Sequence, residues 1–149
     1  MTWAPFVTLA TNLPFVLMAT AGFAVLFDVP RRALALATGI GLIGYLARQV
    51  LAVVGVTPEP ATYLAALVIG LLSQEGGQRL RLPIVILTVP AVIPLIPGVP
   101  AFRAVVDFVN ADYLSGLANV VRAILIASAI GAGLGTVTAV VRMRDKPVY

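Results

Sequence analysis

The sequence predicts an all-α polytopic membrane protein that folds as a single transmembrane domain over residues 1–149. Apolar residues make up 60% of the chain and charged residues only 11%, whereas ordinary soluble domains carry about 25% charged residues. The mean hydropathy is +1.05. Because a span needs about 20 apolar residues, the chain has room for about five helices that cross the bilayer.

The apolar stretches are separated by short segments rich in proline, glycine and charge. The first stretch ends at the turn Asp28-Val29-Pro30, and the second ends at Thr57-Pro58-Glu59-Pro60. The third is short and closes in a polar loop at 74–79. The last leads into a charged tail. We therefore expect spans over residues 3–27, 33–56, 61–75, 82–110 and 113–141.

The fourth span is broken by a dense group of helix-breaking residues, which are Pro90, Pro94, Pro97, Gly98 and Pro100. Proline removes a backbone donor and clashes with the preceding helical turn. In hydrocarbon, each freed backbone group costs several kcal/mol unless protein or water satisfies it. Broken helices of this kind build binding sites in transporters, although a kinked structural helix or a short outer loop gives the same pattern. We expect two helical pieces joined at about Pro94–Pro100, with Arg103 and Asp107 on one face of the outer piece.

The basic residues predict the orientation in the membrane. With the amino terminus outside and the carboxy terminus in the cytoplasm, the outer segments hold only Arg103. The inner segments then hold Arg31, Arg32, Arg79, Arg81, Arg142, Arg144 and Lys146, as the positive-inside rule requires. A re-entrant fourth segment would instead place the amino terminus inside. The first stretch lacks a basic n-region, so we do not expect a cleaved signal peptide.

Two arginines lie within spans instead of at their ends. At 1.5 Å per residue, Arg48 lies roughly 22 Å from the cytoplasmic end of its span and Arg122 roughly 13 Å from the outer end of its own. The proline break begins roughly 18 Å along the fourth span, at a similar depth. One reading is a structural pair with Asp107 or Asp112, or a side chain that extends to the interface. The other is a fixed positive charge that attracts a substrate carboxylate.

Asn119 lies near the same depth and has the same two readings. Its amide is suited to donate a hydrogen bond to a substrate, or to link two helices. The residues that we expect to bind substrate or to line its pathway are Arg48, Pro94, Pro97, Gly98, Arg103, Asn119 and Arg122.

Several classes of function are disfavoured by the composition. The chain has no cysteine and no histidine, so we expect no disulfide, thiol chemistry or metal site. No catalytic constellation predicts an enzyme, and the basic residues form no patch for nucleic acid. Gly39, Gly41 and Gly44 match a dinucleotide fingerprint but lie within an apolar span, so we expect no cofactor. We interpret them, like Gly131, Gly133 and Gly135, as sites of close helix packing.

The chain resembles the ThrE-type threonine/serine exporter family. The run 21–34, with its Phe-Asp-Val-Pro-x-Arg turn, looks like the opening of the family's small-subunit half, and 90–98 resembles its central proline signature. Arg48 follows Gly44 in a Gly-x-x-x-Arg context similar to that of family members. The resemblance covers roughly residues 9–142.

The resemblance implies a split exporter. Some members are one chain of about ten spans, and others are two proteins, of which this chain is similar to the carboxy-terminal half of about five spans. It implies export of serine and threonine, or of a dicarboxylate such as succinate, across the cytoplasmic (inner) membrane with a separate membrane subunit. Arg103, an added cation beside the break, favours anions.

Two functions remain open on the sequence. The first is one half of an exporter for small carboxylates, completed by the separate subunit, either with or without assembly into a homo-oligomer. The second is a non-transporting membrane scaffold or assembly subunit. The proline break and the two arginines within spans favour the exporter. The shortage of carboxylates within the spans points to a coupling residue on the partner.

Overall fold

The computed structural model describes the backbone of residues 4–144 and the side chains of residues 11–143. The expected start of the first span at Trp3 and the end of the tail, 145–149, lie outside the described residues. The described chain is helical, with α1 at Ala4–Leu26, α2 at Arg31–Val53, α3 at Pro58–Leu80, α4 at Ile84–Val92, the 3-10 helix η1 at Ile93–Leu95, α5 at Gly98–Val109 and α6 at Tyr113–Arg144. The predicted all-α fold is confirmed.

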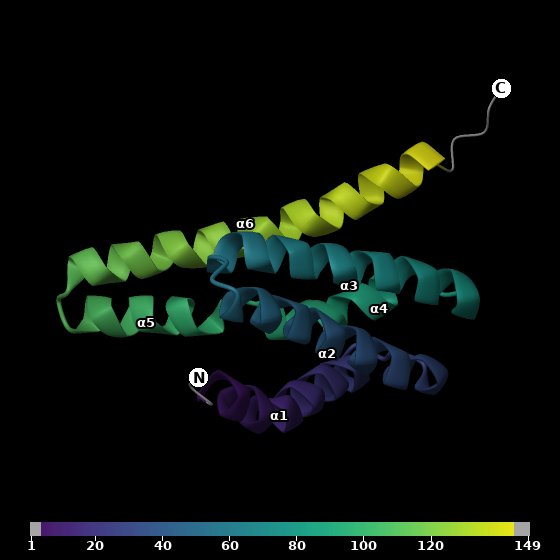
Figure 1. Ribbon diagram of the computed structural model, residues 1–149, viewed down its shortest axis with the longest axis horizontal. Coiled ribbons are helices and arrows are strands. Elements are labelled where there is room, and N and C mark those ends of the chain that lie inside the picture. Colours follow the sequence, from purple (N-terminus) through teal and green to yellow (C-terminus); the bar gives the residue numbers. More distant parts are fainter. Residues whose placement is uncertain (1–3, 145–149) are drawn as a thin grey trace.

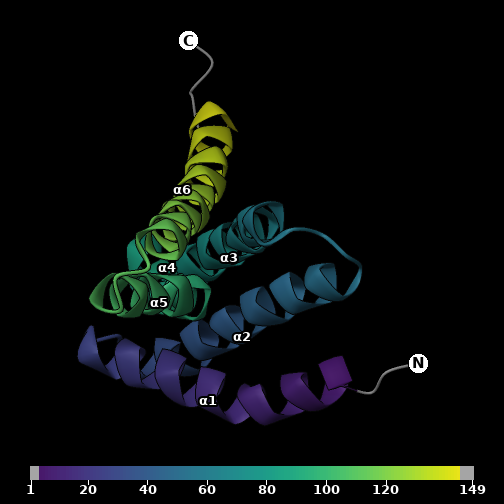
Figure 2. The same cartoon turned by 90° about the vertical axis from the view of Figure 1, so that its left-hand side faces the viewer.

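The core lies where α2, α3 and α4 meet. Helix α2 packs between α1 and α3, and α4 contacts all three of these helices (Figure 2). Fully buried side chains at the centre include Ala37 of α2, Ile69 of α3, and Leu87 and Ala91 of α4. Small residues such as Ala37 and Ala91 let the helix backbones approach closely, which is how membrane helices gain packing energy without a hydrophobic driving force.

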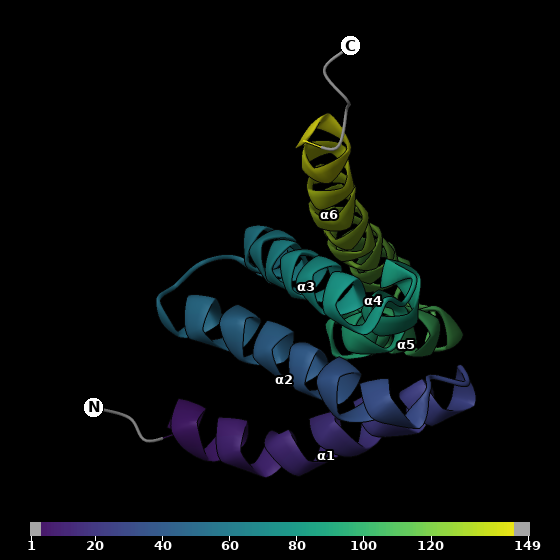
Figure 3. The same cartoon turned by 90° about the vertical axis from the view of Figure 1, so that its right-hand side faces the viewer.

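Helices α5 and α6 form a hairpin beside this core. Helix α5 runs along the first half of α6 (Figure 1), and α6 also packs against α3. The carboxy-terminal end of α6 extends away from the other helices (Figure 3). Through these contacts, α6 holds α5 in place relative to α3.

The fourth apolar segment is broken where the prolines predict. Helix α4 continues directly into η1. The two helical pieces on either side of the break, Ile84–Leu95 and Gly98–Val109, are bent relative to each other by 49°. The second piece begins at Gly98, so Pro100 lies in its first turn, where a missing N–H costs nothing. The Gly98 N–H donates to the Ile96 carbonyl at 2.8 Å, which satisfies one backbone group at the break.

The third helix is longer than predicted. The expected polar loop at 74–79 is helical, and α3 continues to Leu80. The Glu75 and Arg79 side chains form an ion pair of 2.9 Å one turn apart, which supports the helix there. Gly76 is buried under the Leu36 and Leu87 side chains, so glycine here serves packing instead of a turn.

By length and composition, two or three helical segments of the described chain can cross a membrane. They are α2, Tyr113–Met143 of α6 and, if the bent pair counts as one span, α4 with α5. The described part of α1, Thr11–Leu26, is a shorter apolar helix. Polar residues near its end lower the hydropathy of α3. The chain is thus a membrane protein of apolar helices, and the crossing of about five spans stays a prediction.

The predicted close packing at glycines is confirmed at three positions. A Cβ on Gly41 would lie 3.2 Å from the Ala91 Cα, and a Cβ on Gly44 would overlap the Ile69 side chain. Gly133 is equally crowded. The prediction is wrong at three others, where a Cβ would meet nothing within 4 Å: Gly39, Gly131 and Gly135.

Candidate functional site

Three arginines from three helices line one pocket of about 280 Å³. Arg48 comes from α2, Arg103 from α5 and Arg122 from α6, and Asn119 of α6 lies beside them. We call this site the arginine pocket. Its remaining lining residues are Pro58, Val99, Pro100 and Ile126.

Helix geometry explains how these side chains meet. Asn119, Arg122 and Ile126 are three and four residues apart, so they lie on one face of α6. Arg103 lies one turn beyond the break in α5, and the bend at Pro97 sets the direction of that helix. Arg48 enters from the last third of α2. The structure therefore brings together four of the residues singled out from the sequence.

The other three sequence candidates stand outside the pocket lining. Pro94 lies in η1, Pro97 precedes α5 and Gly98 is its first residue. They lie at the 49° bend between α4 and α5, which sets the direction of the helix that carries Arg103. Sequence reasoning missed Pro58, because nothing in the sequence shows that the start of α3 packs here. Ile126 could have been found from its spacing to Asn119 and Arg122 on α6.

The three arginines have no acidic partner in the described part of the chain, where the only ion pair joins Arg79 to Glu75. Arg48 is half-buried, and Arg103 and Arg122 are exposed to the pocket or to the surface. An arginine at the centre of a membrane helix costs about 2.5–3.5 kcal/mol on insertion scales. Two arginines within spans and a third beside them, none in an ion pair within the described residues, favour an anion from outside this chain.

The two aspartates expected as structural partners bind other groups. Asp107 is half-buried and accepts a hydrogen bond of 2.7 Å from the Asn119 Nδ2. It forms no ion pair with Arg103, although the two are one turn apart in α5. The reading in which Arg48 or Arg122 pairs with Asp107 therefore finds no support within the described residues, where the Asp107 carboxylate is hydrogen-bonded to Asn119 and the only ion pair joins Arg79 to Glu75.

Asp112 lies in the connection between α5 and α6. It accepts a hydrogen bond of 3.2 Å from the Ser115 backbone N–H at the start of α6. Hydrogen bonds from the Ser115 side chain and then from its backbone lower the pKa of the Asp112 carboxyl. The Asp112 carboxylate thus caps the amino terminus of α6, and within the described residues it forms no ion pair with Arg48 or Arg122.

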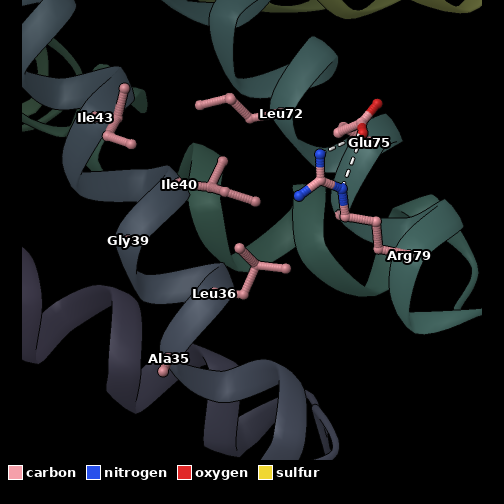
Figure 4. Close-up of a pocket in the computed structure, with 9 residues that line it drawn as sticks. Ala35, Leu36, Gly39, Ile40, Ile43, Leu72, Glu75 and Arg79 are labelled. Carbon is pink, nitrogen blue, oxygen red and sulfur yellow. Dashed lines mark hydrogen bonds and ion pairs between the residues drawn. The ribbon is translucent and has the colours of Figure 1, made fainter.

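A larger hollow of about 360 Å³ lies between α2 and α3. Figure 4 shows that its wall is formed by apolar side chains such as Leu36, Ile40 and Leu72, with the paired Glu75 and Arg79 at one end. Its charges neutralise each other, so it offers no unpaired group for a polar solute. The arginine pocket is smaller but has the chemistry of a binding site for anions.

A comparison with protein families identifies what the chain is similar to. Residues 12–140 match the family model described as threonine/serine exporter, ThrE. This match covers the whole arginine pocket and the break between α4 and α5. In the comparison with solved structures, no match was found.

Proposed function

Because the chain belongs to the threonine/serine exporter family, we propose that it is a subunit of a secondary transporter that exports small carboxylates across the cytoplasmic membrane. The observation that carries the proposal is the arginine pocket, which is lined by three arginines that form no ion pair within the described residues. A guanidinium binds a carboxylate through two parallel hydrogen bonds, which fixes both its position and its orientation. The family membership indicates a transporter and not an enzyme.

The pocket has the size of a small metabolite. At about 30 Å³ per water molecule, its 280 Å³ holds a molecule such as threonine or succinate together with a few waters. Threonine and succinate have the same number of non-hydrogen atoms, so size does not separate them. Threonine and succinate differ instead in charge and in hydrogen-bonding groups. The proposed function includes both as substrates.

We further propose that a separate membrane subunit completes the exporter. The pocket is open, and two of its arginines are exposed on this chain. In a bilayer, such charges need water, substrate or protein beside them. Asp107, the half-buried carboxylate beside the pocket, is already hydrogen-bonded to Asn119, so we place the ion-coupling carboxylate on the partner.

Export by the complex tests the proposal. The chain is purified together with the separate membrane subunit, and both proteins are reconstituted in liposomes. The liposomes are then loaded with radiolabelled serine, threonine or succinate. We expect efflux of at least one of these substrates from liposomes that hold both proteins, and only background efflux from liposomes that hold this chain alone. Background rates for all three substrates with both proteins present would overturn the proposal.

The proposed topology has about five spans with the amino terminus outside. Single cysteines are informative because the natural chain has none. A membrane-impermeant maleimide applied to whole cells is expected to label Val54→Cys and Asn110→Cys. Phe27→Cys is expected to react only after permeabilisation. All three side chains are exposed in the structure, so differences in labelling report the side of the membrane.

The same three variants separate the proposed topology from the re-entrant alternative. If α4 and α5 enter and leave on one side, Phe27→Cys and Asn110→Cys react from outside and Val54→Cys does not. That pattern would show that the bent pair is a re-entrant hairpin. The cysteine-free wild-type chain is the control for non-specific labelling.

A further inference from the structure

The hydrogen bond between Asn119 and Asp107 connects the arginine pocket to a group outside it. Asn119 of α6 lines the pocket, whereas Asp107 of α5 is not among its lining residues. The Asn119 Nδ2 and the Asp107 Oδ2 are 2.7 Å apart, and both side chains are half-buried. Hydrogen bonds to an ionised acceptor are shorter and stronger than neutral ones.

This bond decides which end of the Asn119 amide faces Asp107. An ionised carboxylate only accepts hydrogen bonds, whereas an asparagine amide has a donor end and an acceptor end. Only the NH₂ end can donate to Asp107, so the Oδ1 end of the amide does not bind this carboxylate. Within the described residues, no group donates a hydrogen bond to the Asn119 Oδ1. Asn119 thus carries an acceptor with no partner among the described residues, on a side chain that lines the pocket.

An unpartnered acceptor on a side chain that lines the pocket beside three arginines has a consequence for selectivity. The guanidinium groups supply only donors, so they suit the carboxylate oxygens of any substrate. The Asn119 Oδ1 suits a substrate that also carries a donor, such as an ammonium or a hydroxyl group. A simple dicarboxylate carries no such donor when ionised, and it would leave this acceptor unsatisfied.

We infer that Asp107 is a positioning residue that holds the Asn119 carbonyl toward the arginine pocket and so makes the pocket prefer hydroxy amino acids over dicarboxylates. The inference rests on the proposed function, because it concerns the selectivity of that pocket. Asp107 acts through Asn119 and does not itself touch the substrate. Its negative charge also offsets part of the repulsion between the arginines and a substrate ammonium.

Competition in liposomes that hold the complete complex tests the inference. The concentrations of unlabelled threonine and of unlabelled succinate that halve the efflux of the labelled substrate are measured for each variant. Asp107→Asn replaces the obligate acceptor by an amide that binds either end of Asn119. We expect the half-inhibitory concentration of threonine to rise about tenfold, and that of succinate to stay the same or to fall.

Two further variants show whether Asp107 works through Asn119. Asn119→Leu removes the acceptor directly and is expected to give the same change in the threonine-to-succinate ratio. The double variant Asp107→Asn with Asn119→Leu should change the ratio no more than Asn119→Leu alone. Asp107→Glu, which keeps an ionised acceptor, is expected to retain a preference for threonine and provides the test if Asp107→Asn fails to assemble.

Asp112→Asn is the matched control. It removes the same charge from the same end of the molecule but leaves the Asn119 amide in place. We expect the ratio of its half-inhibitory concentrations for threonine and succinate to equal that of the wild type. Wild-type efflux with an unchanged ratio in Asp107→Asn and Asn119→Leu would overturn the inference and leave the proposed function intact. Wild-type complex that transports no carboxylate would overturn the proposed function instead.

Discussion

Replacing Arg48 by lysine is expected to leave the subunit assembled and to lower export at least tenfold. Lysine keeps the positive charge, but it lacks the planar fork that holds a carboxylate through two hydrogen bonds. Loss of one such bond to a charged group is worth about 1.5–3 kcal/mol, which corresponds to a tenfold to hundredfold change. Subunit abundance in the membrane and the initial efflux rate are measured side by side.

Arg48→Ala separates a role in transport from a role in folding. If Arg48 held Asp107 in a buried pair, its removal would cost about 3–5 kcal/mol, and a second change at Asp107 would restore assembly. In the structure, the Asp107 carboxylate is bound by Asn119, so Arg48→Ala strands no carboxylate. We therefore expect normal abundance and no export from this variant.

Arg79→Lys is the control for the Arg48 variants. It makes the same chemical change at an exposed ion pair outside the arginine pocket, where surface pairs contribute about 0–1 kcal/mol. Both abundance and efflux should stay close to the wild type. Full efflux by Arg48→Ala would exclude Arg48 from substrate binding. Lost abundance that Asp107→Ala restores would show that Arg48 is structural.

The sequence predicts the depth of the pocket residues along their helices, but it does not predict the direction in which each side chain points. Counting 1.5 Å per residue places Arg48, Arg122 and the proline break at a similar depth, and the structure brings Arg48, Arg103 and Arg122 together. Counting gives no information on which way a side chain points. For that reason the sequence left open whether Asp107 pairs with Arg48, and only the packing of α5 on α6 shows that Asn119 holds it.

The same limit explains what the sequence reading misjudged in the fold. Gln74, Glu75 and the two glycines that follow read as a loop, because polar residues and glycine disfavour a membrane helix. The helix persists because Glu75 binds Arg79 and because Gly76 and Gly77 are buried against neighbouring segments. The Glu75–Arg79 pair is local and is visible in the sequence, but the packing of Gly76 against Leu36 of α2 and Leu87 of α4 is a tertiary contact that a single segment of sequence does not reveal. The proline break, by contrast, is a local property, and it lies where predicted.

Gly133→Ala is expected to destabilise the protein strongly, although it adds only one methyl group. Gly133 lies where α6 crosses α3, and a Cβ there would come within 2.7 Å of both the Tyr63 carbonyl oxygen and the Ala66 Cβ. Neither atom is the end of a flexible side chain, so the helices themselves must separate. Overpacking of this kind costs about 1–3 kcal/mol. The thermal midpoint in detergent and the abundance in the membrane measure the effect.

Gly131→Ala and Gly135→Ala are matched controls on the same helix, because a Cβ at either position meets nothing within 4 Å. Alanine favours a helix over glycine by about 1 kcal/mol, so these variants should be as stable as the wild type or more so. A shift of α6 away from α3 would also move Asn119 and Arg122 relative to Arg48, and we therefore expect Gly133→Ala to lose export beyond its loss of abundance. Equal thermal midpoints for the three alanine variants would contradict the close α3–α6 contact on which the geometry of the arginine pocket depends.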